Sequence, residues 1–357
     1  MMITGSVKAI WVSCLVIFTV MIVTYSFSTR FVVAGPADGY ITTIAGGGVG
    51  DKSQAVLASL INPSSVVVDM VGNMYIADPD AHRIRKVDSK TGVITTFAGN
   101  GTSGFTGDDG PAVSAQLSFP RGVALDTNQN LLIADTENNR IRRVDVSNGV
   151  ITTLAGDGRF SFSGDGGLAI SASLRAPYGI AVDGVGDLVI ADTFNNRIRK
   201  VDNVTRLIST VAGNGMFGYS GDTGQAIDAS LRHPESVAIG DHNNVFIADS
   251  SNHRVRMLEI STGIIVTFAG NGNSNYSGDG GSATEATLFQ PSGLTFSGNR
   301  GKLFVADTGN HRIRQISIVT GVISTVAGDG NPGFSIESGI ASLASLNAPK
   351  GVGLNTF

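Results

Sequence analysis

Cysteine is nearly absent from this sequence of 357 residues, and charged residues are scarce. The single cysteine, Cys14, lies in an apolar N-terminal segment, so the rest of the chain has neither a disulfide nor a thiolate metal site. Only 15% of the residues are charged and the formal net charge is −4, so the basic excess typical of nucleic-acid binding is missing. We therefore expect no nucleic-acid partner.

Helix-favouring runs are also scarce after the N-terminal segment. Glycine is abundant instead, with 47 residues, and ten prolines accompany it. The glycine share is well above the usual one of roughly 7%. This composition indicates an all-β protein with many turns, and a chain of this length can bury a large core.

Signatures of common catalytic and metal sites are missing as well. The sequence has no G-x-S-x-G, no H-E-x-x-H and no Cys/His cluster, so no catalytic residue, metal or cofactor is predicted. G-x-G-x-x-G does occur at residues 99–104, 213–218 and 328–333. A dinucleotide site needs a long helix after that motif, whereas here it leads into a loop and recurs with a repeat.

The N-terminus carries an uncharged stretch, Ala9–Thr29, between Lys8 and Arg30. At about 1.5 Å per residue, a helix of this length spans a bilayer core. Residues 1–34 are therefore predicted to be a signal anchor or transmembrane helix that ties the protein to the membrane. The alternative is a signal peptide cleaved after Ala34. In either case the rest of the chain leaves the cytosol, membrane-anchored or secreted. Three sequons in expected loops agree with this location, and they predict glycosylation at Asn100, Asn203 and Asn275.

A stretch reading IADTENNRIR, Ile133–Arg142, recurs in five related copies whose aspartates are 57, 57, 57 and 58 residues apart. A fixed period of this length marks a repeat architecture. In each copy an apolar run ends at the aspartate, turn-forming residues follow, and polar and apolar residues then alternate, which predicts a β-hairpin. We expect each hairpin to be held by a pair between its aspartate and the arginine five residues later: Asp78–Arg83, Asp135–Arg140, Asp192–Arg197, Asp249–Arg254 and Asp307–Arg312.

One complete repeat predicts four strands, at residues 122–126, 130–135, 140–145 and 150–155. The short connections between them predict antiparallel pairing. Four-stranded units of this kind, arrayed radially, form a β-propeller, and a solenoid is the alternative. The repeats lie near residues 63–98, 120–155, 177–212, 234–269 and 291–327, with a partial one at 349–357.

Glycine-rich inserts of about twenty residues separate the repeats. In the insert after Gly99, Asp109 is predicted to cap a short helical turn that begins with Pro111 and Ala112. The Ser-Gly-Asp-Gly-Gly segments are interpreted as turns with helix caps. Calcium is the alternative, but the usual D-x-[DN]-x-[DN]-G loop is missing. The aspartates concerned are Asp165 and Asp279, with variants at Asp108 and Asp222.

The repeat, P-x-G-[VI]-A-[VL]-D followed by N-L-x-I-A-D-T-x-N-N-R-I-R and V-I-T-T-x-A-G, resembles the NHL repeat over residues 40–357. The resemblance implies a propeller, usually six-bladed, that serves in most members as a binding platform for protein or RNA. More distant look-alikes, the gluconolactonase-like hydrolases and peptide-amidating lyases, hold a metal in the central channel. A propeller enzyme of that type is the alternative function, and a purely structural surface module is a third. The glycine-rich insert departs from the shorter family repeat.

The strand count predicts five complete blades over residues 63–327. What remains is a fourth strand at Tyr40–Ala45 and a first strand at Gly351–Leu354, so the second and third strands of a sixth blade are missing. We therefore expect a partial sixth blade. A five-bladed ring with two spare strands is the alternative.

Recurring charged residues are interpreted as structural. The arginine pairs, from Arg83 and Arg85 to Arg312 and Arg314, recur beside their own aspartates, which favours structural pairing over a basic binding face. His82, His253 and His311 occupy a slot that holds asparagine in other copies, so they are predicted to be turn residues. The first strands should line the channel with residues that carry no metal ligand, which argues against catalysis. These are Val67, Ala124, Ala181, Ala238, Thr295 and Gly353.

One position changes between copies while its neighbours stay nearly constant. It follows the proline that opens each blade and is Ser64, Arg121, Tyr178, Glu235, Ser292 or Lys350. In a propeller this position lies at the channel mouth, where residues of all blades converge. Arg121, Tyr178, Glu235 and Lys350 are therefore predicted to bind a protein or other ligand, although a solvated position under no selection would vary too. The sequence thus favours a non-catalytic binding scaffold.

Overall fold

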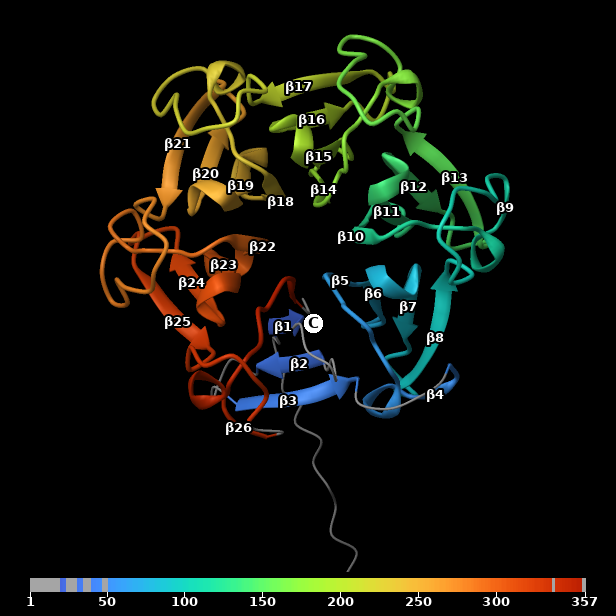
Figure 1. Cartoon of the computed structure of the whole chain (residues 1–357), viewed down its shortest axis with the longest axis horizontal. Helices are drawn as coiled ribbons and strands as arrows, with labels where there is room; N and C mark the ends of the chain where they lie inside the picture. The colour runs from blue at the N-terminus through green and yellow to red at the C-terminus, as the bar shows by residue number, and fades with distance from the viewer. Residues whose placement is uncertain (1–19, 24–30, 35–39, 47–50, 336–337, 355–357) are drawn as a thin grey trace, which may run out of the picture.

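The computed structural model describes residues 20–23, 31–34, 40–46, 51–335 and 338–354. Figure 1 shows β-sheets arranged around a central axis as the blades of a propeller. The chain runs from blade to blade around this axis, as the colours from blue to red show. Within the described ranges, the only helical elements are short 3-10 turns. The all-β propeller predicted from the repeats is confirmed.

Five sheets between Ser65 and Ala327 are antiparallel, with their four main strands in sequence order from the axis outward. The innermost strands are β5 (Ser65–Val68), β10 (Pro120–Leu125), β14 (Ile180–Val182), β18 (Pro234–Ile239) and β22 (Pro291–Ser297). The second strands are β6 (Met74–Asp78), β11 (Leu131–Asp135), β15 (Leu188–Asp192), β19 (Val245–Asp249) and β23 (Lys302–Asp307). The third strands are β7 (Arg83–Val87), β12 (Arg140–Val144), β16 (Arg197–Val201), β20 (Arg254–Glu259) and β24 (Arg312–Ser317). The fourth strands are β8 (Val93–Ala98), β13 (Val150–Ala155), β17 (Ile208–Ala212), β21 (Ile264–Ala269) and β25 (Ile323–Ala327). Two sheets gain a short outer strand, β4 (Ser53–Gln54) or β9 (Gly110–Pro111).

The strand boundaries follow from local side-chain chemistry. In the repeat that begins at Pro120, the fourth strand is the predicted one and the other three shift by no more than two residues. The first strand ends before Asp126 because the Asp126 carboxylate accepts the N–H groups of Asn128 and Asn130, at 2.9 and 2.8 Å. These two bonds close the turn to the second strand.

A sixth sheet joins segments from both ends of the chain. It contains β26 (Ser338–Ile340), β3 (Tyr40–Ala45), β2 (Phe31–Ala34), β1 (Val20–Val23) and β27 (Val352–Leu354), in that order. The predicted fourth and first strands correspond to β3 and β27. The expectation that the second and third strands are missing is corrected, because β1 and β2 pair between them.

The described part of the uncharged stretch Ala9–Thr29 is extended. Val20–Val23 pairs with β2 on one side and with β27 on the other. Paired strand backbone cannot belong to a continuous helix, so the predicted helix is wrong at these residues. The rest of the stretch lies outside the described residues. Among the residues that the structure describes, no helix has the length and apolar character needed to cross a bilayer.

The core lies between neighbouring blades. Leu131 and Ile133 pack in a cluster with Tyr75 and Ala77 of the preceding blade, whereas Leu132 packs in a cluster that includes the following blade. Successive strand residues point to opposite faces of a sheet, so a run of apolar residues buries both faces at once. Burial of each large apolar side chain contributes roughly 1.5–3 kcal/mol. Stacking of the blades thus explains why these strands are apolar throughout.

The glycine-rich inserts are anchored between the blades by small apolar residues. In the first complete insert, Ala112, Ala115 and Leu117 are fully or almost fully buried. The predicted helical turn is a 3-10 turn, and no side chain caps it, so the capping role of Asp109 is corrected. The equivalent 3-10 turns are η1 (Ala55–Leu57), η3 (Ala112–Ser114), η5 (Ala169–Ser171), η7 (Ala226–Asp228) and η12 (Ala341–Leu343). Two others, η8 (Asp241–Asn243) and η10 (Gly298–Arg300), join first and second strands.

The hairpin turns between second and third strands also connect neighbouring blades. Each is a 3-10 turn, namely η2 (Pro79–Ala81), η4 (Thr136–Asn138), η6 (Thr193–Asn195), η9 (Ser250–Asn252) or η11 (Thr308–Asn310). A left-handed residue follows, and it is His82, Asn139, Asn196, His253 or His311. The Nδ1 atom of the histidine ring, or the side-chain amide oxygen Oδ1 of asparagine, accepts a hydrogen bond from a backbone N–H group of the next blade. The prediction that these histidines are turn residues is confirmed, and the shared acceptor explains the exchange with asparagine.

Candidate binding site at the channel mouth

The six residues that follow the blade-opening prolines line one depression at an end of the central channel, with a cavity volume of about 70 Å³. They converge because each precedes an innermost strand, or lies at its beginning, and all innermost strands begin at the same end of the ring. The residues are Ser64, Arg121, Tyr178, Glu235, Ser292 and Lys350. All four predicted binding residues therefore lie around one opening.

Glycine allows the innermost strands to approach closely at this opening. A Cβ atom on Gly122 would lie 2.1 Å from the carbonyl oxygen of Tyr178, and one on Gly293 would lie 2.3 Å from that of Lys350. Both contacts are shorter than any real Cβ tolerates, so only glycine fits at these two positions. The narrow ring of backbone brings the preceding side chains of different blades together.

The side chains at the mouth fall into two groups. The Ser64 hydroxyl donates to the carbonyl oxygen of Arg121 at 2.7 Å, and the Ser292 hydroxyl donates to that of Lys350 at 2.9 Å. Both serines thus bond to the next blade. The Arg121 guanidinium instead lies 4.6 Å from the centre of the Tyr178 ring. The two serines therefore bond to backbone, and the other four positions supply the large and charged side chains at the mouth.

Glu235 is the acidic member of this ring. Among the described residues, none lies within hydrogen-bond or ion-pair distance of its carboxylate. Burial in the wall raises the pKa of Glu235, and the charges of Lys350 and Arg121 act in the opposite direction. Burial likewise raises the pKa of Tyr178. The mouth therefore presents two cations, a carboxylate without a partner and an aromatic ring.

The channel beyond the mouth has small and apolar walls. A cavity of about 420 Å³ is lined by all six residues predicted from the first strands, Val67, Ala124, Ala181, Ala238, Thr295 and Gly353. Their predicted place in the channel is confirmed. These six wall positions carry no titratable side chain. Asp69, which also lines the cavity, lies at the end of the channel away from the mouth.

The hairpin aspartates do not pair with the arginines that the sequence predicts. Asp135 accepts the Ser118 N–H at 2.7 Å, the Asn138 side chain at 2.8 Å and Arg142 at 3.3 Å. Arg140 faces Asp135 across the strands, yet it donates to backbone carbonyls of Asn138 and Asp157. The true pairs join each aspartate to the arginine seven residues later: Asp135–Arg142, Asp192–Arg199, Asp249–Arg256 and Asp307–Arg314. In the first blade, Asp78 accepts two backbone N–H groups and Arg85 pairs with Asp51.

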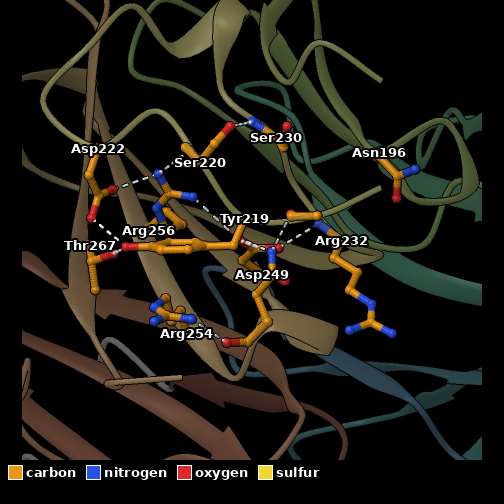
Figure 2. A network of polar contacts seen from close by, with 12 residues as sticks. Asn196, Tyr219, Ser220, Asp222, Ser230, Arg232, Asp249, Arg254, Arg256 and Thr267 are labelled. Atoms are coloured by element: carbon orange, nitrogen blue, oxygen red, sulfur yellow. Dashed lines mark hydrogen bonds and ion pairs between the residues drawn. The ribbon is translucent and has the colours of Figure 1, made fainter. Parts of the chain in front are cut away.

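Each buried arginine also pairs with an aspartate from the preceding insert. In the blade shown in Figure 2, Arg256 contacts Asp249 at 3.5 Å and Asp222 at 2.6 Å. Thr267 shares the hydrogen-bond network around Asp222. The same second partner recurs as Asp108, Asp165 and Asp279. The prediction that these aspartates lie in turns is confirmed, because a glycine N–H donates across each of them to the carbonyl three residues back. The predicted helix-capping role is corrected, because no side chain caps the 3-10 turns η3, η5 and η7 and the aspartates pair with arginine instead.

An aromatic ring from each complete insert covers both arginines of the hairpin. The Tyr219 ring lies between Arg254 and Arg256, with guanidinium carbons 3.7 and 4.9 Å from its centre (Figure 2). Phe105, Phe162 and Tyr276 take the same place in their blades. The arginine pairs therefore hold inserts to hairpins, as the structural interpretation predicts. Recurrence of these rings every 57 residues was the signal for this role in the sequence.

Asp249 and Asp222 share the buried guanidinium of Arg256, and their pKa values shift in opposite directions: burial raises the pKa of Asp249 to about 6, whereas that of Asp222 is lowered. Burial raises the pKa of Asp135 to about 6, although hydrogen bonds from Ser118 and Asn138 and the charge of Arg142 act in the opposite direction. For Asp222, desolvation is outweighed by hydrogen bonds from Thr267 and Tyr219 and by Arg256, so its pKa is lowered. All three partners of the Asp135 carboxylate are donors, which keeps the group ionised at neutral pH.

The raised pKa of Asp135 predicts a pH-dependent stability difference between the wild type and Asp135→Asn. Because the folded-state pKa is about 6, against 3.8 as the ordinary value, the stability from proton binding is present below pH 3.8 and lost as the pH rises through 6. Lowering the pH from about 7.5 to about 5 should therefore stabilise the wild type relative to the variant by roughly 1–2 kcal/mol. Urea unfolding of both proteins at each pH measures the difference, in which other titrating groups cancel. A pH-independent difference would contradict the raised pKa.

The three predicted glycosylation sites lie outside the regular strands. Asn100 and Asn275 are exposed, and Asn203 is partly exposed. The Asn100 side chain bonds locally, accepting the Thr102 N–H at 2.8 Å. Glycosylation itself stays a prediction.

Comparison with known proteins agrees with the repeat and the fold. The NHL repeat model matches residues 117–144, 231–257 and 290–316. SUPPRESSOR OF QUENCHING 1, a chloroplastic protein of Arabidopsis thaliana, is 31% identical over 262 residues, which are 71% of this chain and 24% of that protein. NHL repeat-containing protein 2 of Homo sapiens is 27% identical over 313 residues, which are 80% of this chain and 43% of that protein. The chain thus spans less than half the length of these relatives.

The fold also resembles that of solved structures. A chain in a nidogen/laminin complex superposes with a TM-score of 0.61 at 12% identity, covering 94% of this chain and 98% of that chain. At this identity the likeness shows the fold alone. The matched repeats, the relatives that carry the same repeat and the propeller architecture lead to one conclusion: the chain belongs to the NHL-repeat family.

Proposed function

We propose that this protein is a non-catalytic binding scaffold whose partner contacts the channel mouth. The observation that carries the proposal is the convergence of the positions that differ between copies around one depression. Residues that are identical in every copy stabilise the blade, which is common to all copies. Residues that differ between copies can instead determine which partner binds at the mouth. Arginine and tyrosine, two residue types enriched among binding hot spots, occupy two of these positions as Arg121 and Tyr178.

The charges at the mouth indicate what a partner must offer. The Glu235 carboxylate calls for a donor, such as an N–H group or an ammonium group, because it has no partner among the described residues. Arg121 and Lys350 call for acceptors on the same partner, and the Arg121 Nε has no acceptor among the described residues. A protein loop carries donors and acceptors side by side. A protein is therefore the class of partner that we propose.

Site-specific crosslinking tests this proposal. A photoreactive residue in place of Tyr178 should form a covalent adduct with a partner protein from extracts of the source tissue or medium. The matched control carries the same residue in place of Val319, which is 89% exposed and lies in the β24–β25 turn, at the other end of the blade. Adducts from position 178 alone support the mouth. Adducts that are the same from both positions, or from position 319 alone, would place the partner elsewhere.

The propeller-enzyme alternative makes a different demand on the channel. A catalytic metal would need several ligands on the channel wall, where Ala124, Ala181 and Ala238 lie. Among the described residues, no group of three or more His, Cys, Asp or Glu side chains is placed to hold a metal. Metal analysis of the purified protein provides a direct check. A stoichiometric divalent ion, lost together with a hydrolytic or lyase activity, would overturn the binding proposal.

We also propose that the propeller lies outside the cytosol. The sequons support this location, and Asn100 and Asn275 are exposed enough to carry glycans. Anchoring through Ala9–Thr29 competes with strand β1, because Val20–Val23 cannot belong to a membrane helix and to the sixth sheet together. N-terminal sequencing and glycosidase treatment of the mature protein distinguish these states. An unmodified chain at all three asparagines would speak against the location.

A further inference from the structure

A cluster of exposed aromatic rings lies beside the mouth. Phe160 and Phe217 are 53% and 55% exposed and come from two successive inserts. Phe194, 37% exposed, comes from the hairpin turn η6 between these inserts. Large exposed aromatic groups are uncommon unless they serve an interaction. Together with Arg175, Arg232 and His233, these three rings form what we call the aromatic–arginine patch.

Ring contacts make the patch continuous. The Phe194 ring centre lies 6.2 Å from that of Phe160 and 5.1 Å from that of His233. His233 in turn lies 5.0 Å from Phe217. On the inner side, Phe194 lies 6.1 Å from Tyr178, which joins the patch to the mouth. A partner seated at the mouth could therefore extend over the patch without a gap.

Two arginines complete this surface. The Arg175 guanidinium lies 4.5 Å from the centre of the Phe160 ring, and that of Arg232 lies 4.3 Å from the centre of Phe217. Among the described residues, no carboxylate lies within ion-pair distance of either guanidinium. Arg159, which precedes Phe160 in the insert, differs from these two arginines because it pairs with Asp157 at 3.8 Å. The patch is thus cationic on a chain whose net charge is −4.

The blade does not need these residues. Ser103 and Ser274 occupy the place of Phe160 and Phe217 in other copies, and those copies fold in the same way. The place of Phe194 is held by Glu137, Ser251 or Gly309, and that of Arg175 by Ser118. By contrast, a ring recurs at the position of Phe162 because it covers the hairpin arginines. The patch is therefore a feature of two neighbouring copies and not of the fold.

We propose that the aromatic–arginine patch docks an acidic segment of a partner protein. Unpaired guanidinium groups bind carboxylates through paired hydrogen bonds, and the exposed phenylalanine rings bury apolar side chains between those carboxylates. Single-stranded RNA also uses arginine and aromatic rings, but its bases stack on open ring faces. The guanidinium groups of Arg175 and Arg232 already cover faces of Phe160 and Phe217. The surface therefore favours an acidic peptide over RNA.

Fluorescence anisotropy with the full chain tests the proposal with three labelled probes. The first is a peptide in which glutamate alternates with leucine and phenylalanine, the second has lysine in place of glutamate, and the third is oligouridine. The acidic peptide should bind, whereas the lysine peptide and oligouridine should not. The double variant Arg175→Ser, Arg232→Ser should weaken acidic-peptide binding by about tenfold or more. The double variant Phe160→Ser, Phe217→Ser should weaken binding to the same extent, because it removes the two exposed rings. Serine is chosen because it occupies the equivalent positions in other copies, so the blades should still fold.

Val319→Ser is the control for exposed surface and should leave binding unchanged. Thermal unfolding of each variant shows whether the blades are intact. Absence of acidic-peptide binding to the wild type, equal binding of the lysine peptide, or no effect of the arginine variant would overturn the proposal. Preferential binding of oligouridine would overturn it in favour of RNA. Because the patch lies outside the mouth, its failure leaves the mouth proposal standing.

Discussion

Replacing Arg256 by methionine is expected to lower the free energy of unfolding by about 3–5 kcal/mol. The Arg256 side chain is completely buried and holds two carboxylates, Asp249 at 3.5 Å and Asp222 at 2.6 Å. Asp249 is itself buried, so loss of the guanidinium leaves a buried negative charge without its cation. Methionine keeps much of the side-chain volume, and the loss therefore reports on charge and hydrogen bonding more than on packing.

Arg254→Met is the matched control in the same hairpin. Arg254 is partly exposed and donates to the backbone carbonyls of Asn252 and Asn271, at 3.0 and 2.8 Å. Its replacement should cost only about 1 kcal/mol, the usual net value of such hydrogen bonds. Urea denaturation of both variants measures the two losses. Equal losses, or a larger loss for Arg254, would mean that the ion pairs are assigned to the wrong arginine.

These two arginines show how far the sequence leads at the hairpin. Both alternate with valine in the same strand, and the sequence predicts pairing for the one that lies directly opposite the aspartate. The backbone register is indeed Asp249 opposite Arg254. However, Arg254 lies next to the hairpin turn and donates to backbone carbonyls, whereas Arg256 is two residues further along the strand, is buried and pairs with a second carboxylate from the insert. That second partner is 34 residues away, so local spacing could not reveal it.

The double variant Arg121→Ser, Tyr178→Ser is expected to weaken partner binding by about ten- to a hundredfold. It removes the stacked cation and ring from the mouth. Stability should change little, because serine occurs naturally at this position in two other copies. There the Ser64 and Ser292 hydroxyls donate to the carbonyl of the next blade, and the introduced serines can form the same bond.

The partner identified by crosslinking is titrated against the wild type and against the double variant to measure the change in affinity. Thermal unfolding of both proteins measures the change in stability. Arg256→Met should have the opposite effect: its stability should fall, but its affinity, measured at a temperature where it stays folded, should be nearly unchanged. Unchanged affinity of the mouth variant would contradict the proposed site. Loss of affinity together with a large loss of stability would show that the mouth residues act through the fold.

Prediction of the mouth was possible because the repeat supplies its own reference. With the neighbours of Arg121 nearly constant between copies, the change at this one position is visible in the sequence alone, and the radial arrangement brings the changes together. The aromatic–arginine patch was missed because its residues come from separate segments, Phe160 from an insert and Phe194 from a hairpin turn. The sixth sheet was missed because apolar, β-branched residues such as those of Val20–Val23 suit a strand as well as a membrane helix.

Hydrogen–deuterium exchange of the full chain, with and without its partner, tests the central claim most directly. Binding at the mouth predicts slower exchange in peptides that contain Arg121, Tyr178 and Glu235, which come from three different blades and meet only there. Exchange around Val319, at the other end of the blade, should not change. Protection confined to the outer strands or to the turn at Val319, with none at the mouth, would contradict the proposed binding site.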